Sequence, residues 1–406
     1  MIEGFKKIQL KDACNIFADG DWIERKDQSS EGIRLVQTGN IGFCFFKDKK
    51  DKSRYISEET FKRLNCTEIV PGDLLVSRLP DPVGKSCIIP EINSKMITGV
   101  DCTIIRPKDN LSSEFLGYYQ MSYQYLKDVQ ANVSGATRQR ISRKKLGLIE
   151  IPLPPLPQQK QIVAILDKAF AAIDTAKANA EQNLQNAKEL FESYLQNVFE
   201  NKGDDWQVEK LGVLGKLTSS KRIYKKEYVS SGVPFYRSKE IKELSHKRKL
   251  SIELYISEQR YTEIKNKFEI PKQGDLLLTA VGTIGEMYIV KKDEKFYFKD
   301  GNIMWLKDFS SLNSYYLKYA LTNFVERLKA LSQGAAYSAL TIEKLKEYSI
   351  PIPPIEEQEK IVLKLDALSA ECKKLEAIYT KKIADLEEMK KSILQKAFSG
   401  QLNTIN

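Results

Sequence analysis

Apolar residues recur with a seven-residue period in two long stretches that contain neither glycine nor proline, 158–199 and 357–398. In the second stretch, the a and d positions of the heptad hold Ile361, Leu365, Leu368, Cys372, Leu375, Tyr379, Leu386, Met389 and Ile393, with Lys382 as the interruption. The first stretch is less regular and holds Ile162, Leu166, Ala169, Ile173, Ala176, Ala180, Ala187, Leu190 and Tyr194, with Asn183 as its polar position. This period predicts two helices of equal length, each about 60 Å long.

A single helix of this kind would leave its apolar seam in water, so we expect the two helices to pair as a coiled coil. The main pairing positions are the larger aliphatic side chains Ile162, Leu166, Ile173, Leu190, Ile361, Leu365, Leu368, Leu375, Leu386 and Ile393. The first helix leads into the region of the chain that separates the two helices, and the second helix leads out of it. If the ends of that region lie close together, as domain termini often do, the helices run antiparallel. The alternative is that each helix packs separately on its own domain.

The segments before the two helices indicate that the chain is an internal duplication. A proline-rich segment, 151–159, is repeated as 350–358, and Tyr-Ile-Ser-Glu at 55–58 is repeated at 255–258. Gly-Asp-Leu-Leu also occurs twice, at 72–75 and 274–277. A period near 200 residues is far longer than that of solenoid repeats, so a whole domain with its helix is duplicated.

Each globular half combines strand-like and helical patterns. The Tyr-Ile-Ser-Glu segments predict short helices capped by Ser57 and Ser257, and the Gly-Asp-Leu-Leu segments lead into strands. Tyrosine-rich amphipathic helices are expected over 114–129 and 312–331. The predicted fold class is α+β: two similar mixed α/β domains separated by two long helices that form an antiparallel coiled coil, with a pseudo-two-fold internal repeat. The predicted boundaries are 1–157, 158–203 with a linker at 201–205, 204–355, and 356–406.

The composition favours a polyanionic partner. The chain carries 64 Lys and Arg against 54 Asp and Glu, a net charge of +10, which favours nucleic acid first and an anionic membrane second. A basic but merely solvated surface is the alternative. No window has the roughly 18 apolar residues of a membrane span, and the N-terminus lacks the apolar region of a signal peptide. Six cysteines without C-x-x-C spacing predict reduced thiols in a cytoplasmic protein, and no metal site is expected.

Motifs for catalysis are not found in the sequence. His246 is the single histidine and lies in a run of charged residues, where a solvated surface position is the expectation. Val83-Gly84-Lys85-Ser86 resembles the end of a phosphate loop, but Leu79 stands where that loop requires glycine. Gly282-Thr283-Ile284-Gly285 and its counterpart in the first half are expected to be hairpin turns. We therefore expect a protein that is not itself a catalyst.

Several polar and basic segments are candidates for contact with DNA. The main one is the loop that contains Ser134, Thr137, Arg138, Gln139, Arg140 and Arg143, because arginine can bind guanine or phosphate through two hydrogen bonds. Its counterpart contains Tyr337 and Ser338 but no arginine. The further candidates are Gln37, Thr38, Asn40, Arg78, Ser219, Ser220, Lys221, Arg222, Arg237, Ser238, Lys239 and Thr279. The alternatives are a basic helix start for the loop and ordinary surface positions for the others.

The order of domain, proline-rich segment and long helix, present twice, resembles the specificity subunit of type I restriction–modification systems. The most specific elements are Ile151-Pro152-Leu153-Pro154-Pro155-Leu156-Pro157-Gln158-Gln159, its repeat Ile350-Pro351-Ile352-Pro353-Pro354-Ile355-Glu356-Glu357-Gln358, and the terminal segment Leu394-Gln395-Lys396-Ala397-Phe398-Ser399-Gly400-Gln401-Leu402. The likeness covers the whole chain. One departure is Glu357 in the place of Gln158, which we expect to be neutral.

The resemblance implies two target-recognition domains, each of which reads one half of a bipartite, asymmetric site in double-stranded DNA. It implies helices that set the unread spacer and a scaffold for two modification (methyltransferase) subunits. It further implies S-adenosylmethionine on those subunits, and restriction subunits that use ATP and Mg²⁺ for translocation and cleavage. This chain would bind no cofactor and carry no catalytic residue. A specificity chain that serves a methyltransferase without a nuclease, a coiled-coil scaffold that binds proteins rather than DNA, and an enzyme with an unrecognised site remain as alternatives.

Overall fold

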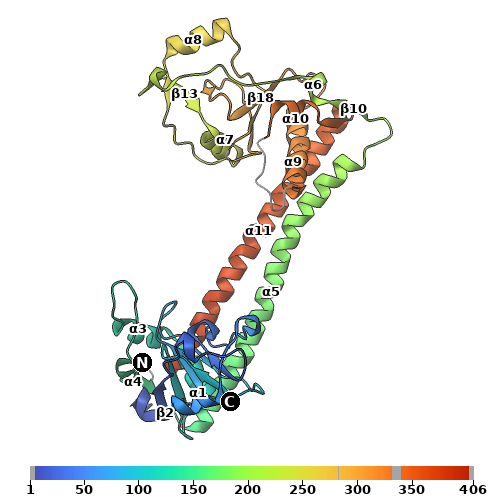
Figure 1. Ribbon diagram of the computed structural model, residues 1–406. Helices are drawn as coiled ribbons and strands as arrows, with labels where there is room; N and C mark the ends of the chain where they lie inside the picture. The colour runs from blue at the N-terminus through green and yellow to red at the C-terminus, as the bar shows by residue number, and fades with distance from the viewer. Residues whose placement is uncertain (1–4, 282, 332–339, 402–406) are drawn as a thin grey trace. The chain divides into compact units, whose positions relative to one another are not determined.

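The computed structural model describes residues 5–281, 283–331 and 340–401. The chain divides into two compact units, Met1–Glu181 with Thr380–Asn406, and Gln182–Tyr379. Helix α5 (Leu156–Glu200) gives its first part to the first unit and its last part to the second, and helix α11 (Ile355–Phe398) does the reverse. Within each unit, the segments of the two helices run side by side (Figure 1).

The first unit contains three separate groups of strands. A four-stranded antiparallel sheet has the order β2-β8-β5-β6, a three-stranded sheet has the order β4-β3-β7, and β1 pairs with β9. The strands are β1 (Lys7–Gln9), β2 (Cys14–Asp19), β3 (Ile33–Val36), β4 (Arg54–Ile56), β5 (Leu74–Ser77), β6 (Ser86–Ile88), β7 (Met96–Thr98), β8 (Cys102–Pro107) and β9 (Glu150–Pro152). The helices are α1 (Glu58–Arg63), α2 (Ser113–Gln120), α3 (Tyr123–Ala131) and α4 (Arg143–Gly147).

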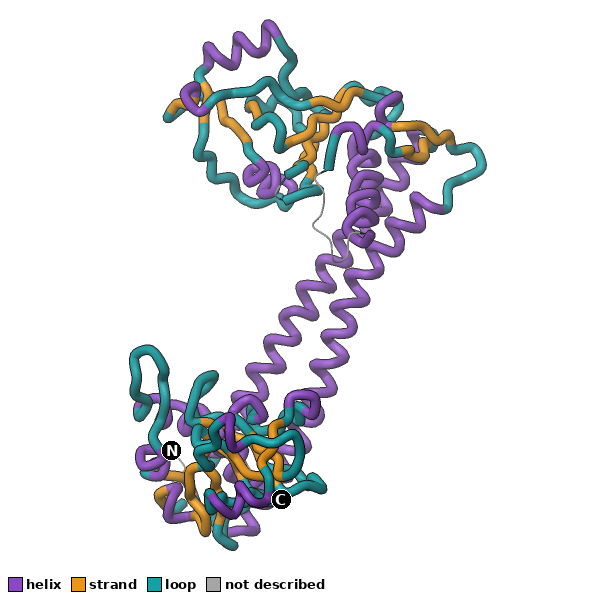
Figure 2. Tube along the Cα trace, in the orientation of Figure 1, coloured by secondary structure: helices purple, strands orange, loops and turns teal. Residues whose placement is uncertain are grey.

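The second unit repeats this plan. A four-stranded sheet has the order β11-β18-β15-β16, a second has the order β12-β14-β13-β17, and β10 pairs with β19. The strands are β10 (Gln207–Lys210), β11 (Lys216–Thr218), β12 (Tyr228–Val229), β13 (Val233–Tyr236), β14 (Tyr255–Ile256), β15 (Leu276–Thr279), β16 (Met287–Ile289), β17 (Tyr297–Phe298), β18 (Ile303–Lys307) and β19 (Ser349–Ile352). The helices are α6 (Leu211–Leu214), α7 (Ser238–Ser245), α8 (Glu258–Lys267), α9 (Ser314–Leu331) and α10 (Ile342–Lys346). Loops occupy much of both units (Figure 2). The α+β duplication predicted from the sequence is confirmed.

The two long helices are antiparallel in both units. In the first unit, Lys390 Nζ lies 2.8 Å from Asp174 Oδ1, and Lys177 Nζ lies 2.6 Å from Glu387 Oε1. In these two pairs the residue number increases along α5 and decreases along α11, so the helices run in opposite directions. In the second unit the ends of the pair share one core, which includes the buried side chains of Leu195, Phe199, Val362 and Leu365. None of the helices in the described ranges is both long enough and apolar enough to cross a membrane.

Most of the predicted pairing positions are shielded from solvent, with one exception. Ile162, Leu166, Ile173 and Leu365 are buried, and Ile361, Leu368, Leu375, Leu386 and Ile393 are partly buried. Leu190, by contrast, is 50% exposed, so the prediction for this residue is wrong. The buried face of α5 there follows Ala187, Leu195 and Phe199, because a straight helix has 3.6 residues per turn and drifts away from a strict heptad.

A buried glutamine fixes the start of each long helix. Gln159 Oε1 accepts a hydrogen bond from the Ser112 N–H at 2.8 Å, and its Nε2 donates to the carbonyls of Asn110 and Pro154 at 2.8 Å. The side chain of Gln159 is fully buried. Gln358 makes the equivalent bonds in the second unit, to Asn313 N–H at 2.7 Å and to the Ser311 and Pro353 carbonyls at 2.9 Å. The proline-rich segment therefore ends in a side chain that ties the helix to its own domain.

The other end of each helix closes the other domain. Phe398, at the end of α11, packs on Phe115 and Tyr119 of α2, with ring centroids 5.4 and 5.3 Å apart. Phe199, at the end of α5, packs on Tyr316 of α9 with centroids 5.4 Å apart. Each globular core is thus completed by two helix ends, one from each repeat.

Several helix boundaries differ from the sequence prediction. The stretch 114–129 is not one helix but two, α2 and α3, because Ser122 adopts an extended backbone and caps α3 by accepting the N–H of Tyr125. The long helices begin two residues earlier than expected, at Leu156 and Ile355. Pro157 fits the first turn of α5, since the backbone N–H groups there have no partner within the helix.

Candidate nucleic-acid interface

The predicted basic loop of the first unit is exposed and closed on itself. Every residue from 134 to 140 is exposed, including Thr137 and Gln139. Ser134 and Arg140 exchange two backbone hydrogen bonds of 2.9 Å, which close the loop. Gly135 has a φ of +104°, and a Cβ on this residue would lie 2.3 Å from the carbonyl oxygen of Arg138, so only glycine fits the turn. The loop therefore presents its polar side chains from a defined backbone.

Asp101 joins two arginines of this loop to the sheet. Arg138 Nη2 lies 3.4 Å from Asp101 Oδ2, and Arg140 Nη2 lies 3.9 Å from Asp101 Oδ1. The side chains of Arg138 and Arg140 remain 70% and 48% exposed. Because both contacts are longer than a typical charge-assisted hydrogen bond of about 2.8 Å, the arginines stay available to an outside anion.

Arg78 lies inside the fold rather than at its surface. Its side chain is 4% exposed, its Nη2 donates to the Val100 carbonyl, and it lies 3.4 Å from Asp19 Oδ1. Burial lowers the pKa of Arg78. Arg143 also contacts Asp19, at 3.7 Å, with its own side chain 48% exposed. The structure therefore makes Arg78 a buried support of the arginine cluster, and direct base contact by this residue is not supported.

The predicted turn that contains Gln37, Thr38 and Asn40 lies next to Asp101. Asn40 is used within the turn, because its Oδ1 accepts the Gln37 N–H at 3.0 Å and its Nδ2 donates to the Lys47 carbonyl at 3.0 Å. Gln37 and Thr38 instead line a cavity of about 210 Å³, which Trp22 and Asp101 also line. The structure thus brings the first predicted turn and the arginine loop to a single site.

Lysines that the sequence analysis did not select border the same turn. Lys49 Nζ lies 3.4 Å from the position that a Cβ on Gly39 would take. Burial lowers the pKa of Lys85, and the positive charges of Lys47 and Lys49 lower it further. The signal that could have revealed them is the charged run 47–52 beside the aromatic residues 43, 45 and 46. Cationic side chains interleaved with aromatic ones are typical of nucleic-acid contact.

In the second unit, the predicted segment 219–222 is partly structural. Ser219 Oγ donates to the Ile303 carbonyl at 3.2 Å, and Ser220 Oγ donates to the Phe298 carbonyl at 2.7 Å. Lys221 is exposed, with its Nζ 5.2 Å from the centre of the Phe268 ring. Arg222 is 65% exposed and lies 2.7 Å from Asp300 Oδ2. Lys221 and Arg222 are the members of this segment that can reach a ligand.

The segment 237–239 belongs to an ion-pair network. Arg237 Nη2 lies 2.8 Å from both Glu240 Oε1 and Glu253 Oε2, and Lys239 also pairs with Glu253. Lys239 and Arg237 lower the pKa of Glu253 to about 2. Ser238 is partly buried. Lys239 is 56% exposed, so it is the most accessible cation of this group.

Thr279 is not a surface residue. It is fully buried, its Oγ1 accepts the Glu286 N–H at 3.0 Å and donates to the Thr283 carbonyl, and it therefore stabilises a turn. The backbone carbonyl of Thr279 accepts a hydrogen bond from the Gly285 N–H. In the first domain, the carbonyl of Ser77 accepts the equivalent bond from the Gly84 N–H, so Thr279 corresponds to Ser77. Ala280 then occupies the place of Arg78. Tyr337 and Ser338 lie outside the described residues.

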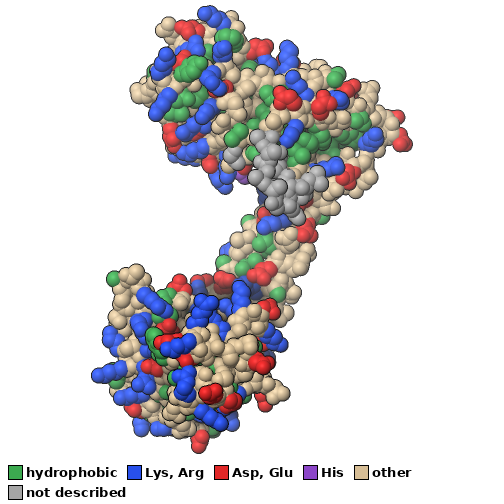
Figure 3. Space-filling view, viewed as in Figure 1, with side chains coloured by type: hydrophobic (Ala, Val, Ile, Leu, Met, Phe, Trp, Pro, Cys, Tyr) green, Lys and Arg blue, Asp and Glu red, His purple; other side chains and the backbone are tan. Residues whose placement is uncertain are grey.

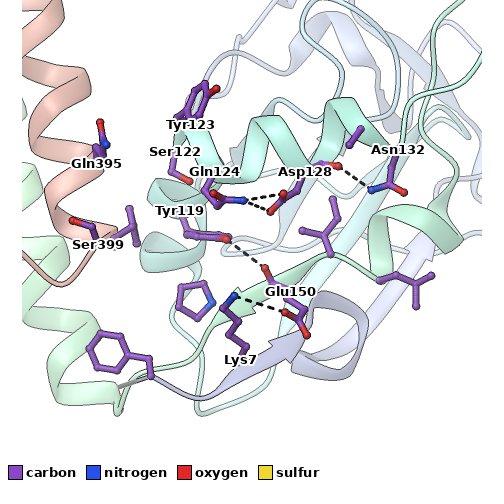
Figure 4. Close-up of a pocket in the computed structure, with 16 residues that line it drawn as sticks. Lys7, Tyr119, Ser122, Tyr123, Gln124, Asp128, Asn132, Glu150, Gln395 and Ser399 are labelled. Carbon is purple, nitrogen blue, oxygen red and sulfur yellow. Dashed lines mark hydrogen bonds and ion pairs between the residues drawn. The ribbon is translucent and has the colours of Figure 1, made fainter. Parts of the chain in front are cut away.

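A second cavity in the first unit is a different site. It has a volume of about 560 Å³ and lies where α3, β1, β9 and the end of α11 meet (Figure 4). Gln124 donates to Asp128 at 2.9 Å, and Lys7 lies 3.8 Å from Glu150 (Figure 4). Among the described residues that line it, Lys7 is the single Lys or Arg, so the arginine and lysine surface is the better candidate for DNA. Figure 3 shows many Lys and Arg side chains on the drawn face of each unit, interspersed with Asp and Glu.

Among the described residues, no group of three or more His, Cys, Asp or Glu side chains could hold a metal ion. His246 is exposed, with its Nε2 3.2 Å from Glu286 Oε1. All six cysteines are unpaired, and burial raises the pKa of Cys87 to about 12.

Comparison with known proteins assigns the chain to a family. A model of the type I restriction modification DNA specificity domain matches residues 2–186 and matches again over residues 203–387. The chain belongs to this family. It carries two copies of the DNA specificity domain, one for each half of the duplication, as the resemblance implied.

Individual members of the family agree in sequence. A putative type I restriction enzyme specificity subunit from Haemophilus influenzae is 32% identical over 272 residues, which cover 65% of this chain and 66% of that protein, just under two thirds. The EcoBI specificity subunit of Escherichia coli is 27% identical over 74% of this chain and 68% of its own length.

Solved structures from type I restriction–modification systems share the fold. The HsdS subunit from Thermoanaerobacter tengcongensis superposes with a TM-score of 0.63 at 18% identity, over 98% of each chain. A chain from a structure that concerns assembly and conformational transition of the type I R-M system superposes with a TM-score of 0.76 at 19% identity, over 98% of this chain and 99% of that one. At these identities the likeness concerns the fold alone.

Proposed function

We propose that this chain is the DNA sequence-specificity subunit of a type I restriction–modification complex, and that each specificity domain reads one half of a bipartite, asymmetric site. The observation that carries the proposal is the duplication of the specificity domain with different side chains at matching places. Arg78 in the first domain corresponds to Ala280 in the second, and Gln37 and Thr38 correspond to Arg237 and Ser238. Two domains with one fold and different surfaces suit two different half-sites.

In the first domain we assign base reading to the cavity and phosphate contact to the cations beside it. The cavity side chains Gln37 and Thr38 offer hydrogen-bond donors and acceptors of the kind that read base edges. The exposed cations Lys47, Lys49, Arg138 and Arg140 would bind phosphates. Six phosphate contacts would give a slope of about −5 in a plot of log affinity against log salt concentration.

In the second domain the corresponding cations are Lys221, Arg222 and Lys239. They are exposed, and Arg222 and Lys239 are each paired with a carboxylate, Asp300 and Glu253. A DNA phosphate could replace either carboxylate, because both pairs are accessible to solvent. This domain would therefore contact its half-site through different residues from the first.

We assign catalysis to partner subunits. Two modification subunits would bind S-adenosylmethionine and methylate the DNA, and restriction subunits would use ATP and Mg²⁺. This chain would supply the scaffold and bind no cofactor of its own. The cytoplasm, where DNA and these cofactors occur together, is the compartment that this role requires.

We also propose that the paired helices set the length of the unread spacer. A matched deletion of one heptad from both helices, for example 176–182 with 382–388, would remove about 10 Å of helix. The expected result is a recognition site with a shorter spacer, or loss of specific binding. Retention of the original spacer would contradict this role for the helices.

The experiment that tests the function is reconstitution with the cognate modification subunits, followed by mapping of methylated bases. The proposed function predicts methylation within one bipartite motif and sequence-specific binding that weakens steeply with salt. Binding of partner proteins without salt-sensitive binding of DNA would indicate a protein-binding scaffold instead.

A further inference from the structure

Asp101 is a carboxylate placed among cations at the surface where we propose that the first domain binds DNA. It lies in the turn before β8, and its backbone carbonyl accepts the Arg78 N–H at 2.9 Å, which fixes its position. Its side chain is 33% exposed and lines the cavity formed with Gln37, Thr38 and Trp22. Asp21 also lines the cavity, but its Oδ2 already accepts the Thr67 N–H at 3.1 Å.

The negative charge of Asp101 does not exclude DNA from this surface. Arg138 and Arg140 lie 3.4 and 3.9 Å from its two oxygens, and the buried Arg78 carries a third positive charge nearby. A carboxylate that is neutralised in this way can enter a DNA groove without net repulsion from the phosphates.

The two arginines leave much of the acceptor capacity of Asp101 unused. An ionised carboxylate offers about four lone-pair sites. Within the described residues, the side chain accepts one hydrogen bond, a long one of 3.4 Å from Arg138. The carboxylate therefore lines the cavity with acceptor sites that are open to a donor from outside.

We propose that Asp101 is a specificity-determining residue that accepts a hydrogen bond from an exocyclic amino group in the major groove, N4 of cytosine or N6 of adenine. In that groove, guanine presents O6 and thymine presents O4 at the corresponding places, and both are acceptors that a carboxylate repels. Asp101 would thus admit cytosine or adenine and reject guanine and thymine at one position of the first half-site. This inference rests on the proposed function and names the chemistry by which the first domain reads its site.

The test compares the reconstituted complex with its Asp101→Asn variant on duplexes that vary each position of the site in turn. Wild-type protein should discriminate by on the order of 10- to 100-fold at one position of the first half-site. The variant should lose the rejection of guanine and thymine there, because an asparagine amide can donate to O6 or O4 as well as accept from an amino group. Duplexes with cytosine and with adenine at this position distinguish the two sources of the amino group.

A base analogue isolates the hydrogen bond itself. Replacing the recognised base by its analogue without the exocyclic amino group, 2-pyrimidinone for cytosine or purine for adenine, should weaken binding of the wild type. The same replacement should weaken binding by Asp101→Asn by a smaller factor, because a hydrogen bond to a neutral amide contributes less than one to a carboxylate. Equal loss in both proteins would overturn the proposal.

Asp19→Asn is the matched control. Asp19 contacts Arg78 and Arg143 in the same cluster but does not line the cavity, so this variant should keep the base preference. Unchanged reading of the second half-site by each variant would show that the protein is folded and assembled.

Three results would count against the proposal. If Asp101→Asn weakened every duplex equally, Asp101 would serve only to position the arginines, and the proposed function would stand. Wild-type preference for guanine or thymine at every position affected by the variant would overturn the assignment of the amino group. Failure of the wild-type complex to bind any DNA sequence specifically would overturn the proposed function together with this inference.

Discussion

Replacement of Gln159 by leucine should destabilise the first unit by about 2–4 kcal/mol. The fully buried side chain makes three hydrogen bonds, to Ser112 N–H and to the carbonyls of Asn110 and Pro154, each 2.8 Å long. A hydrogen bond contributes about 0.5–1.5 kcal/mol net, and a buried partner left without a bond costs about 1–3 kcal/mol. Leucine has a similar volume, so little of the effect should come from a cavity.

Hydrogen exchange of the Ser112 amide measures this contact directly. In the wild type the amide donates to Gln159 Oε1, and in the variant it should lose most of its protection. Urea unfolding gives the accompanying change in the free energy of unfolding. Gln358→Leu should have the same effect on the Asn313 amide in the second unit.

Gln158→Leu is the control, because Gln158 is adjacent, half-buried and makes no side-chain hydrogen bond within the described residues. It should change the free energy of unfolding by less than about 0.5 kcal/mol. If Gln159→Leu behaved like this control, or left the Ser112 amide protected, the buried glutamine would not be what ties the helix to its domain.

Three further predictions concern other parts of the chain. Arg140→Ala should lower the slope of log affinity against log salt concentration by about 1 at every sequence, because we assign this side chain to phosphate contact. Relaxed discrimination at one position of the first half-site, by about 1–3 kcal/mol in base-substitution binding, would show base contact instead. An effect confined to the second half-site would refute its placement. Phe398→Ala should lower the free energy of unfolding, measured in urea, by about 3–5 kcal/mol, because the ring packs on two aromatic rings of α2. Met389→Ala, at a position that is 50% exposed, should lower it by less than about 1 kcal/mol. Burial raises the pKa of the Asp275 carboxyl above its usual value of 3.8, so the folded state binds this proton more tightly than the unfolded state. The stability of the wild type relative to Asp275→Asn should therefore fall as the pH rises from 3.8 through the pKa of the folded state. A constant difference in denaturation midpoint between the two proteins from about pH 4 to about pH 7 would contradict this.

The long-range organisation of the chain was predictable because it rests on strong periodic patterns. Two long heptad stretches without glycine or proline and a duplicated proline-rich segment sufficed for the antiparallel helices and the repeated domain. The break at Ser122 between α2 and α3 was missed, because the tyrosines on both sides continue an amphipathic pattern across it. Leu190 was misplaced because a heptad assumes 3.5 residues per turn throughout.

The site was predicted only in part. Glycine and arginine in the loop 134–143 gave a sequence signal, but Asp101 is an isolated residue in a turn and gave none. Arg78 and Thr279 both follow a Gly-Asp strand, yet backbone hydrogen bonds place Thr279 with Ser77 and leave Ala280 opposite Arg78. Such correspondences depend on strand register, which the sequence of two divergent repeats does not reveal.

Mapping of methylated bases after reconstitution with the modification subunits tests the central claim most directly. Wild-type complex should methylate a single bipartite motif with two unlike halves. Gln37→Ala should alter only one half of that motif, and Arg237→Ala only the other. A continuous motif, or a change in both halves from either variant, would contradict recognition by two separate domains.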